Sequence, residues 1–490
     1  MHRTRATGML LALCVGIAAS AHVGTTNAYF DGMAGPYPIR VIVRTPGVIP
    51  GLAQISIRFT GEVAPSVVTV RPLRWDAGLE GAPPPDTARA VRGEEGLYSA
   101  ELWLMTIGSY SVHVHVMGPL GEGTVFVPVN AVAERRLDMH PVMVAGLIGM
   151  VVFLFFGAVT IFGAAVRESV LPPGDDPDPK RRRRAVIAMG LGGIGLATLM
   201  WGGWSWWGAV DAAYRSAMFR PLTTTSTVAD TDGGPILTLR IDDPAWLGRE
   251  WTPLIPDHGK LMHMFLVRDD GLSAFAHIHP ESADSSTFVV PFPPLPPGDY
   301  RIYADIVHAS GFAQTLVDTV TVGAAALGAS IEPVRDADDS WAELPPLGEA
   351  AGARFDLPSG RSIVWEDGRE PRVDAETTLG FRVTEADGTP SALEPYMGML
   401  SHAAVTRDDG SVFIHLHPFG SISMAAQDRF ERAEAPGAST SAKNMPGVAT
   451  GNAVTFPFVF PRAGAYRIFV QVKIGGTVET AAFDVDVPEA

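Results

Sequence analysis

Hydrophobic and polar residues alternate with a period of two through most of residues 29–133. The clearest runs are residues 39–43, 67–70 and 111–116, and turns rich in proline and glycine separate them. Alternation of this kind is typical of strands that bury one face. Several short strands at this spacing predict an antiparallel β-sandwich.

Two long apolar runs, residues 141–166 and 185–210, interrupt the alternation. Each is long enough to cross about 30 Å of hydrocarbon as a helix. The loop between them, residues 167–184, ends in Lys180 and four consecutive arginines, and short basic loops stay in the cytoplasm. Neither run contains an acidic residue or a histidine, which transporters normally need inside the membrane. We predict a two-helix anchor in the lipid bilayer of a bacterial inner membrane, with the N- and C-terminal domains in the periplasm.

The chain after the second apolar run resumes the β pattern in two blocks. Late in each of the three β regions, a glycine-x-tyrosine motif opens an alternating strand, at Tyr110, Tyr300 and Tyr466. In immunoglobulin-like sandwiches a tyrosine at this place bonds back to the preceding corner. We therefore predict three all-β, immunoglobulin-like sandwiches. The last two and their linkers are expected at residues 211–234 (linker), 235–322 (first block), 323–352 (linker) and 353–490 (second block).

The two blocks are an internal duplication. Both copies share a Leu-x-Pro segment that leads to a histidine, then Arg-Asp-Asp-Gly, then His-x-His-Pro. A duplication of this length predicts two domains of the same fold, independently of any strand assignment. The matching positions are Leu254, Pro256, His258, Gly259, Leu261, His263, His277 and His279 in the first copy, and Leu393, Pro395, Met397, Gly398, Leu400, His402, His415 and His417 in the second.

In each copy Asp-Asp-Gly lies between two strand-like runs and predicts a β-hairpin. If the first turn centres on Asp270, His263 lies opposite His277, and His279 is the next residue on the same face. The second copy is one residue shorter, and a turn centred between residues 408 and 409 gives the same arrangement. His402 then lies opposite His415, with His417 next to it.

Three imidazoles within about 5 to 8 Å on one sheet face suit Cu(II), Zn(II) or Ni(II). We take a copper ion as the first choice and zinc as the alternative, while a protein without bound metal stays open. His258 is the candidate fourth ligand of the first copy and Met397 that of the second. A thioether ligand favours Cu(I), so this exchange predicts a harder site and a softer one.

Other interpretations of the histidines remain. The opposite face of the second hairpin is apolar and predicts a core, so the histidine face is expected to be the outer one. There the histidines could be solvated, structural or pH-sensing. A cupin-like metalloenzyme is a further alternative, because Gly271 followed by His277 and His279 resembles the opening of the cupin metal motif. The glutamate of that motif is missing, so we favour a protein that is not an enzyme.

Composition narrows the classes of partner. The chain has 37 Lys and Arg against 53 Asp and Glu, and nucleic acids demand clustered basic side chains, so we exclude a nucleic-acid partner. Residues 1–28 have the basic start, apolar run and small-residue cleavage sites of a signal peptide. The only cysteine, Cys14, lies in that run, so an exported chain would have neither thiolate ligands nor disulfides.

The paired hairpins, from Leu261 and His263 through His277-x-His279-Pro280, resemble a group of exported bacterial proteins of unknown function. Those proteins are sometimes described as associated with copper or other heavy metals. The N-terminal region is similar in general character to periplasmic immunoglobulin-like copper-handling domains. The resemblance implies an exported location and the class of metal. From the histidine pattern we predict a protein that binds a transition metal, or passes it on to a periplasmic metal carrier. The alternative is a scaffold that holds a partner in a membrane complex.

Overall fold

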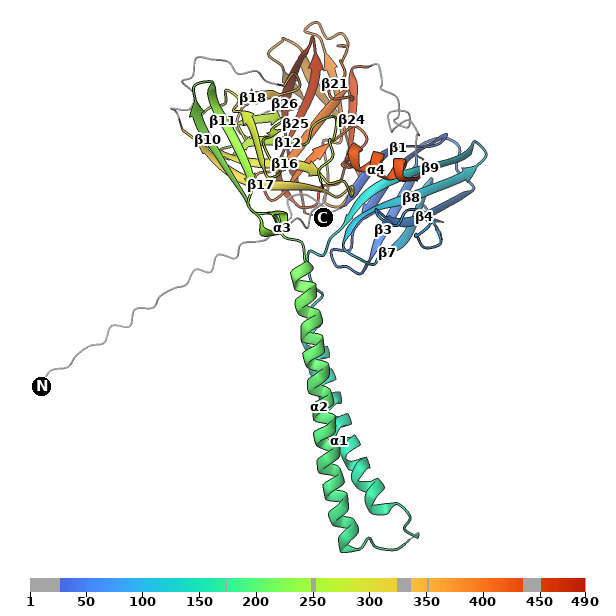
Figure 1. Ribbon diagram of the computed structural model, residues 1–490. Coiled ribbons are helices and arrows are strands. Elements are labelled where there is room, and N and C mark those ends of the chain that lie inside the picture. The colour runs from blue at the N-terminus through green and yellow to red at the C-terminus, as the bar shows by residue number, and fades with distance from the viewer. Residues whose placement is uncertain are drawn as a thin grey trace, which may run out of the picture. The chain divides into compact units, whose positions relative to one another are not determined.

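The computed structural model describes residues 27–172, 174–247, 253–323, 336–349, 352–434 and 451–489. The signal-peptide prediction and Cys14 lie outside the described residues. The chain divides into two compact units (Figure 1): one comprises the chain up to Ala131 and from Arg220 onward, and the other comprises Val132–Phe219.

The first sandwich consists of two antiparallel sheets with strand orders β1-β2-β3-β7-β6 and β5-β4-β8-β9. Without β1, these are the ABED and C′CFG orders of immunoglobulin folds, so the predicted fold class is confirmed for this region. The strands are β1 (Ala28–Ala34), β2 (Tyr37–Arg44), β3 (Gly51–Phe59), β4 (Val67–Arg74), β5 (Asp86–Thr87), β6 (Arg89–Ala90), β7 (Leu97–Leu104), β8 (Gly108–Gly118) and β9 (Gly121–Ala131).

The first repeat has the same arrangement, with sheets β10-β11-β15-β14 and β17-β16-β12-β13-β18. The cupin alternative is wrong at the level of fold, because cupins are jelly rolls with a different strand order. The elements are β10 (Thr224–Thr231), β11 (Gly234–Ile241), α3 (Pro244–Leu247), β12 (His263–Arg268), β13 (Ala274–Ile278), β14 (Glu281–Ser282), β15 (Thr287–Pro291), β16 (Gly298–Val307), β17 (Ala313–Val322) and β18 (Ser340–Glu343).

The second repeat has sheets β19-β20-β21-β24 and β23-β22-β25-β26, and the helix α4 follows β23. Its second sheet again has the C′CFG order. The elements are β19 (Arg354–Asp356), β20 (Ser362–Asp367), β21 (Thr377–Thr384), β22 (Ser401–Arg407), β23 (Phe413–Leu416), α4 (Met424–Glu434), β24 (Ala453–Phe458), β25 (Gly464–Ile474) and β26 (Thr477–Val487).

The tyrosine of each glycine-x-tyrosine motif bonds to the residue four positions earlier. The Tyr300 hydroxyl donates to the Pro296 carbonyl (2.6 Å), and the Tyr466 hydroxyl donates to the Arg462 carbonyl (2.8 Å). In the first sandwich the Tyr110 hydroxyl lies 2.7 Å from the Thr106 hydroxyl. The bond expected at the corner of an immunoglobulin-like sandwich is therefore present in all three domains.

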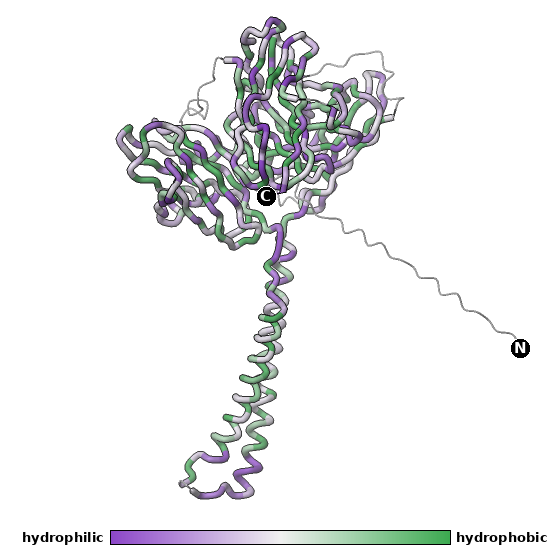
Figure 2. The backbone as a smooth tube through the Cα atoms, turned by 180° about the vertical axis from the view of Figure 1, so that it is seen from behind, coloured by the Kyte–Doolittle hydropathy of each residue, from purple (hydrophilic) through white to green (hydrophobic). Residues whose placement is uncertain are grey.

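Two helices form the second unit, α1 (Pro141–Glu168) and α2 (Pro179–Ala217). By length and composition both could cross a membrane, with mean hydropathies of 2.7 and 1.7 in their most apolar stretches. Figure 2 shows the helices largely hydrophobic and their connection hydrophilic. The predicted basic loop is too long, because Asp178 caps α2 through the Arg181 amide (2.7 Å) and Pro179 begins the helix. The basic block therefore lies in the first turns of α2.

Both predicted linkers contain strands. Residues 224–231 of the first form β10, which pairs with β11 along its whole length. Ser340–Glu343 of the second form β18, which pairs with β13 at the edge of the first repeat's sheet. Alternating residues such as Trp341 and Ala342 are enough for a short edge strand once a partner strand is present.

The C′CFG sheets of the two repeats pack against each other face to face. The shared cluster joins Phe265, Phe275 and Tyr303 of the first repeat to Phe413 and Phe469 of the second. Phe275 stacks on Phe469 at 4.2 Å, and Tyr303 stacks on Phe413 at 4.1 Å. Because Phe275 corresponds to Phe413 and Tyr303 to Phe469 in the duplication, each contact is matched by its counterpart. The repeats therefore meet like the subunits of a two-fold dimer.

Two equivalent arginines show the same reciprocity. Arg467 donates to the Leu272 carbonyl in the first hairpin turn (2.9 Å), and Arg301 donates to the Asp408 carbonyl in the second (2.9 Å). Arg467 is fully buried and its charge is balanced by Asp484, at 2.7 and 2.8 Å. The two hairpins are thus held with their histidine faces toward each other.

Candidate metal centre

The histidine face of each hairpin is buried at the interface between the repeats. The expectation that this face would be outer and open to solvent is wrong, because the sheet of the other repeat covers it. His277 and His402 have no exposed surface, and the side chains of His258 and His415 are 4% and 8% exposed. The histidines gathered at this interface are His258, His263, His277, His279, His402, His415 and His417.

The predicted hairpin register is wrong by two residues. Phe265, and not His263, pairs with His277. In the second hairpin His415 pairs with Ala404 instead of His402. The first turn centres on Gly271 instead of Asp270, and Gly271 and Leu272 both adopt a left-handed conformation, with φ of 62° and 49°. A shift of two leaves every side chain on its original face, so the predicted histidine sets stay together.

The predicted trio of the first copy converges. One nitrogen each of His263, His277 and His279 lies within 4.8 Å of the other two. His263 extends from β12, while His277 and His279 alternate along and just beyond β13. These three residues are called the first triad below.

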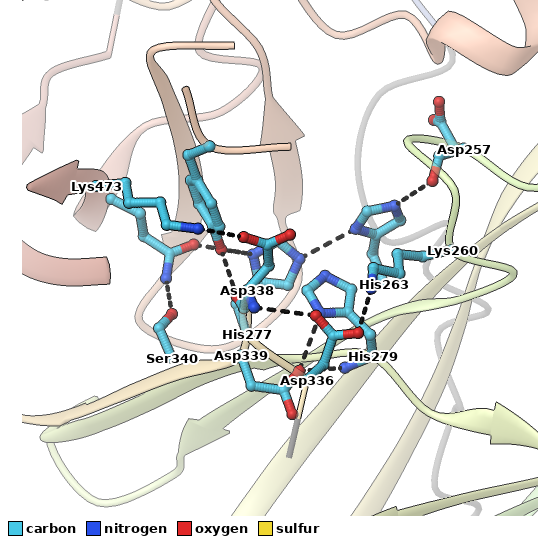
Figure 3. A network of polar contacts seen from close by, with 12 residues as sticks. Asp257, Lys260, His263, His277, His279, Asp336, Asp338, Asp339, Ser340 and Lys473 are labelled. Atoms are coloured by element: carbon cyan, nitrogen blue, oxygen red, sulfur yellow. Dashed lines mark hydrogen bonds and ion pairs between the residues drawn. The ribbon is translucent and has the colours of Figure 1, made fainter. Parts of the chain in front are cut away.

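Hydrogen bonds fix which nitrogen of each ring in the first triad carries the proton (Figure 3). His263 Nε2 donates to the Asp257 carbonyl at 3.1 Å, and His279 Nδ1 donates to Asp339 at 2.9 Å, because both partners can only accept. His277 Nδ1 donates to Gln471 Oε1 at 2.9 Å. That leaves His263 Nδ1, His277 Nε2 and His279 Nε2 with free lone pairs.

With these tautomers, the lone pairs of His263 and His277 face each other. His263 Nδ1 and His277 Nε2 are 3.2 Å apart, although both are acceptors in this arrangement. His279 Nε2 is buried without a hydrogen-bond partner. Buried acceptors are normally satisfied and two facing lone pairs repel, so these nitrogens could serve together as ligands of one cation. Three neutral imidazoles with their other nitrogens held by protein acceptors are the usual form of a histidine metal site.

A second group has a different composition from the one predicted. One nitrogen each of His258, His402 and His417 lies within 4.8 Å of the other two, and these residues form the second triad. The assignment of His258 to the first copy is therefore wrong. Its ring lies 5.5 Å from that of His402 and 5.2 Å from that of His417, both in the other repeat. His258 has a φ of 50° in a tight turn between Asp257 and Lys260, which directs it across the interface.

The second triad also has unpartnered nitrogens. His417 Nδ1 donates to the Ile422 carbonyl (3.1 Å), which leaves Nε2 with a buried lone pair. His258 Nε2 and both nitrogens of His402 are buried without a hydrogen-bond partner. Fewer rings of the second triad than of the first therefore donate a hydrogen bond to a protein acceptor.

His415 and Met397 are the remaining predicted ligands. His415 lies between the triads, with ring centroids 5.5 Å from His277 and 5.4 Å from His402, and its Nε2 is unpartnered. Its Nδ1 is 3.4 Å from Asp305. Met397 has a φ of 49° in the turn equivalent to that of His258, and it is 9% exposed.

Burial favours the neutral form of four histidines of the cluster. Removal from water lowers the pKa of His263, His277, His402 and His417 well below the usual value, and the neighbouring imidazoles lower each pKa further. Burial also raises the pKa of Tyr396, whose hydroxyl lies 3.2 Å from His277 Nδ1. Neutral imidazoles are the form that binds metal, so protons compete weakly for this site near neutral pH.

The acidic residues beside the first triad divide into ion pairs and one histidine partner (Figure 3). Lys260 pairs with Asp336, and Lys473 pairs with Asp338 at 2.9 Å. Asp339 accepts from both the amide and the ring of His279, each at 2.9 Å. The His279 ring is also close enough to the carboxylates of Asp336 and Asp339 for the three groups to bind one metal ion. The ion pair with Lys260, however, already explains the position of Asp336.

A cavity of about 170 Å³ reaches the histidine cluster. Its wall includes His263, His415 and His417 together with the carboxylates of Asp257 and Asp305. The volume is enough for several water molecules, so a hydrated cation has room to approach the imidazoles.

The residues that orient the first triad were missed by sequence reasoning. Asp339 belongs to the predicted linker, and Gln471 and Tyr396 belong to the other repeat. The run of aspartates in the linker was visible, but its proximity to His279 depends on β18 pairing with β13. Nothing in the local sequence connects Gln471 with His277.

Two segments of the chain match a known family model. Residues 225–324 and 359–489 match a family model described as a domain of unknown function (DUF8832). No curated protein matches the chain.

The chain has low similarity to several solved structures. They include the FN1–FN3 domains of chicken CNTN1 (8% identity, TM-score 0.13, covering 91% of this chain and 97% of that one). A fragment of the ICAM-5 D1–D4 ectodomain has 8% identity and a TM-score of 0.14, with coverages of 90% and 74%. Invasin, a bacterial integrin-binding protein, has 11% identity and a TM-score of 0.14, with coverages of 95% and 60%.

Proposed function

We propose that this protein binds a transition metal, copper first and zinc as the alternative, in the histidine cluster between its two repeats. The observation that carries the proposal is the set of buried imidazole nitrogens without hydrogen-bond partners, on His258, His279, His402, His415 and His417. A structural role would satisfy these nitrogens, because an unsatisfied buried acceptor costs about 1 to 3 kcal/mol. A bound metal satisfies them at once.

The ligand chemistry narrows the metal. The triads offer imidazole nitrogens, which suit copper, zinc and nickel and suit magnesium or calcium poorly. The cavity beside the cluster supports a protein that takes up a metal and releases it again. The same geometry counts against the scaffold alternative, for which convergent lone pairs have no purpose.

The helices α1 and α2 complete the proposal as an anchor in the bacterial inner membrane. Both are long and apolar enough, and the basic first turns of α2 would stay in the cytoplasm under the positive-inside rule. The metal-binding repeats would then lie in the periplasm. A periplasmic metal carrier is the partner that such an arrangement would serve.

Metal content of the purified full-length protein tests the proposal. After equilibration with Cu(II) and removal of excess, the wild-type protein should retain two equivalents. The double variant His277→Ala/His279→Ala should retain one, and His402→Ala/His417→Ala should also retain one. His308→Ala is the matched control, because His308 is a buried histidine of the first repeat that bonds to Gln314 outside the cluster. Stoichiometry that both double variants leave unchanged would favour the scaffold alternative.

A further inference from the structure

The two triads are not separated by other layers of side chains. The rings of His258 and His263 are 6.0 Å apart, and those of His277 and His402 are 6.2 Å apart. Each of these pairs joins one triad to the other. Ring contacts therefore run without interruption from the first triad to the second.

These contacts limit how far apart two bound metals can be. A metal bound at about 2 Å from a ring nitrogen lies about 3 Å from that ring's centroid. Two metals on the rings of His258 and His263 can therefore be at most about 12 Å apart even if both rings point outward, since 6.0 Å separates the centroids. The same limit follows from His277 and His402. Lone pairs that converge toward a common interface make the distance shorter.

We propose that the two triads form one paired-metal centre in which the two ions lie close enough to interact directly. This proposal rests on the metal binding proposed above. His415 lies within the pair, since its ring is 5.6 Å from His263 and 4.5 Å from His417. Its unpartnered Nε2 makes it a ligand available to either ion.

The surrounding charges suit two cations. Three carboxylates contact rings of the cluster: Asp339 at His279 (2.9 Å), Asp305 at His415 (3.4 Å) and Asp257 near His258 (3.8 Å). Their three negative charges would offset most of the four positive charges of two divalent ions. Two ions placed between these carboxylates repel each other less than two ions in a purely apolar interior.

The duplication explains how such a pair forms. His277 contacts Gln471 of the second repeat, and the equivalent His415 contacts Asp305 of the first, at positions that correspond in the two repeats. The reciprocal contacts place the two histidine faces around one pseudo-two-fold axis. His258 crosses this axis to complete the second triad, so the pair depends on both repeats together.

Electron paramagnetic resonance of the full-length protein in detergent tests the pair, with Cu(II) as the probe. At two equivalents of Cu(II), we expect dipolar broadening and a half-field transition, or loss of signal through exchange coupling. Dilution of the copper with a nine-fold excess of zinc, at two total equivalents, should restore the spectrum of isolated Cu(II). The His402→Ala/His417→Ala variant with one copper should give that isolated spectrum directly.

Two outcomes distinguish failure of this proposal from failure of metal binding. If the protein retains two copper ions but its spectrum is the sum of two isolated ions and does not change on zinc dilution, the paired centre is refuted while metal binding stands. If the protein retains no copper or zinc, the proposed function fails, and the paired centre fails with it. The zinc dilution uses the wild-type chain, so the result does not depend on a variant that folds.

Discussion

Asp339 offers a sharp test of how the first triad is organised, because it contacts the proposed metal site through His279. Its side chain is 2% exposed, and one oxygen accepts from both the amide and Nδ1 of His279 at 2.9 Å. Asp339→Asn retains an oxygen of the same size but removes the charge that holds this tautomer and makes the imidazole a stronger ligand. Loss of such a partner typically reduces metal affinity about 10- to 100-fold, or roughly 1.4 to 2.7 kcal/mol.

The assay is competition for Zn(II) or Cu(II) between the protein and a chromophoric chelator of known affinity. Asp338→Asn is the matched control, because Asp338 is the neighbouring residue and its carboxylate pairs with Lys473 instead of a histidine. We expect Asp339→Asn to weaken one of two sites by this factor and Asp338→Asn to change neither. Equal affinities for the wild-type protein and Asp339→Asn would refute the role of Asp339, as would an equal loss in both variants.

Three further predictions concern stability. Burial holds the pKa of four buried histidines, His263, His277, His402 and His417, below 6.5. The unfolded chain therefore binds more protons than the folded protein once the pH falls below that value. As a result, the free energy of unfolding of the metal-free protein should decrease by up to about 1.4 kcal/mol per ring between pH 7.5 and 5.5. Urea midpoints at the two pH values measure this, and equal midpoints would contradict it. In the same assay, Arg467→Ala should lower the free energy of unfolding by about 3 to 5 kcal/mol, because it leaves Asp484 without its buried partner. Replacement of the exposed Arg382 should leave the urea midpoint nearly unchanged. Metal at 100 times its dissociation constant should add about 2.7 kcal/mol to the free energy of unfolding for each bound ion. This is seen as a rise in Tm that a chelator reverses, and a Tm insensitive to metal would count against binding.

Sequence alone predicted the β domains and the composition of the histidine faces because both depend on local patterns. The two-residue alternation identifies strands, and an even error in hairpin register keeps His263, His277 and His279 on one face. The glycine-x-tyrosine motif predicted the corner bonds of Tyr300 and Tyr466 for the same reason.

The burial of the histidine faces could not be predicted, because it depends on how two domains meet. A sheet face with polar side chains is normally solvated, and only the stacking of Phe275 on Phe469 and of Tyr303 on Phe413 shows that the faces close on each other. The crossing of His258 to the other repeat follows from that interface and not from its neighbours in sequence. Asp339 was missed because a short strand, β18, brings it to His279 from a segment that resembles a linker.

Anomalous diffraction at the copper edge, from crystals of the full-length protein loaded with copper, tests the central claim most directly. Two peaks are expected. One should lie about 2 Å from His263 Nδ1, His277 Nε2 and His279 Nε2, and the other should lie at similar distances from nitrogens of His258, His402 and His417. Crystals without a peak at the interface between the repeats, or with copper bound only at surface histidines, would contradict the account.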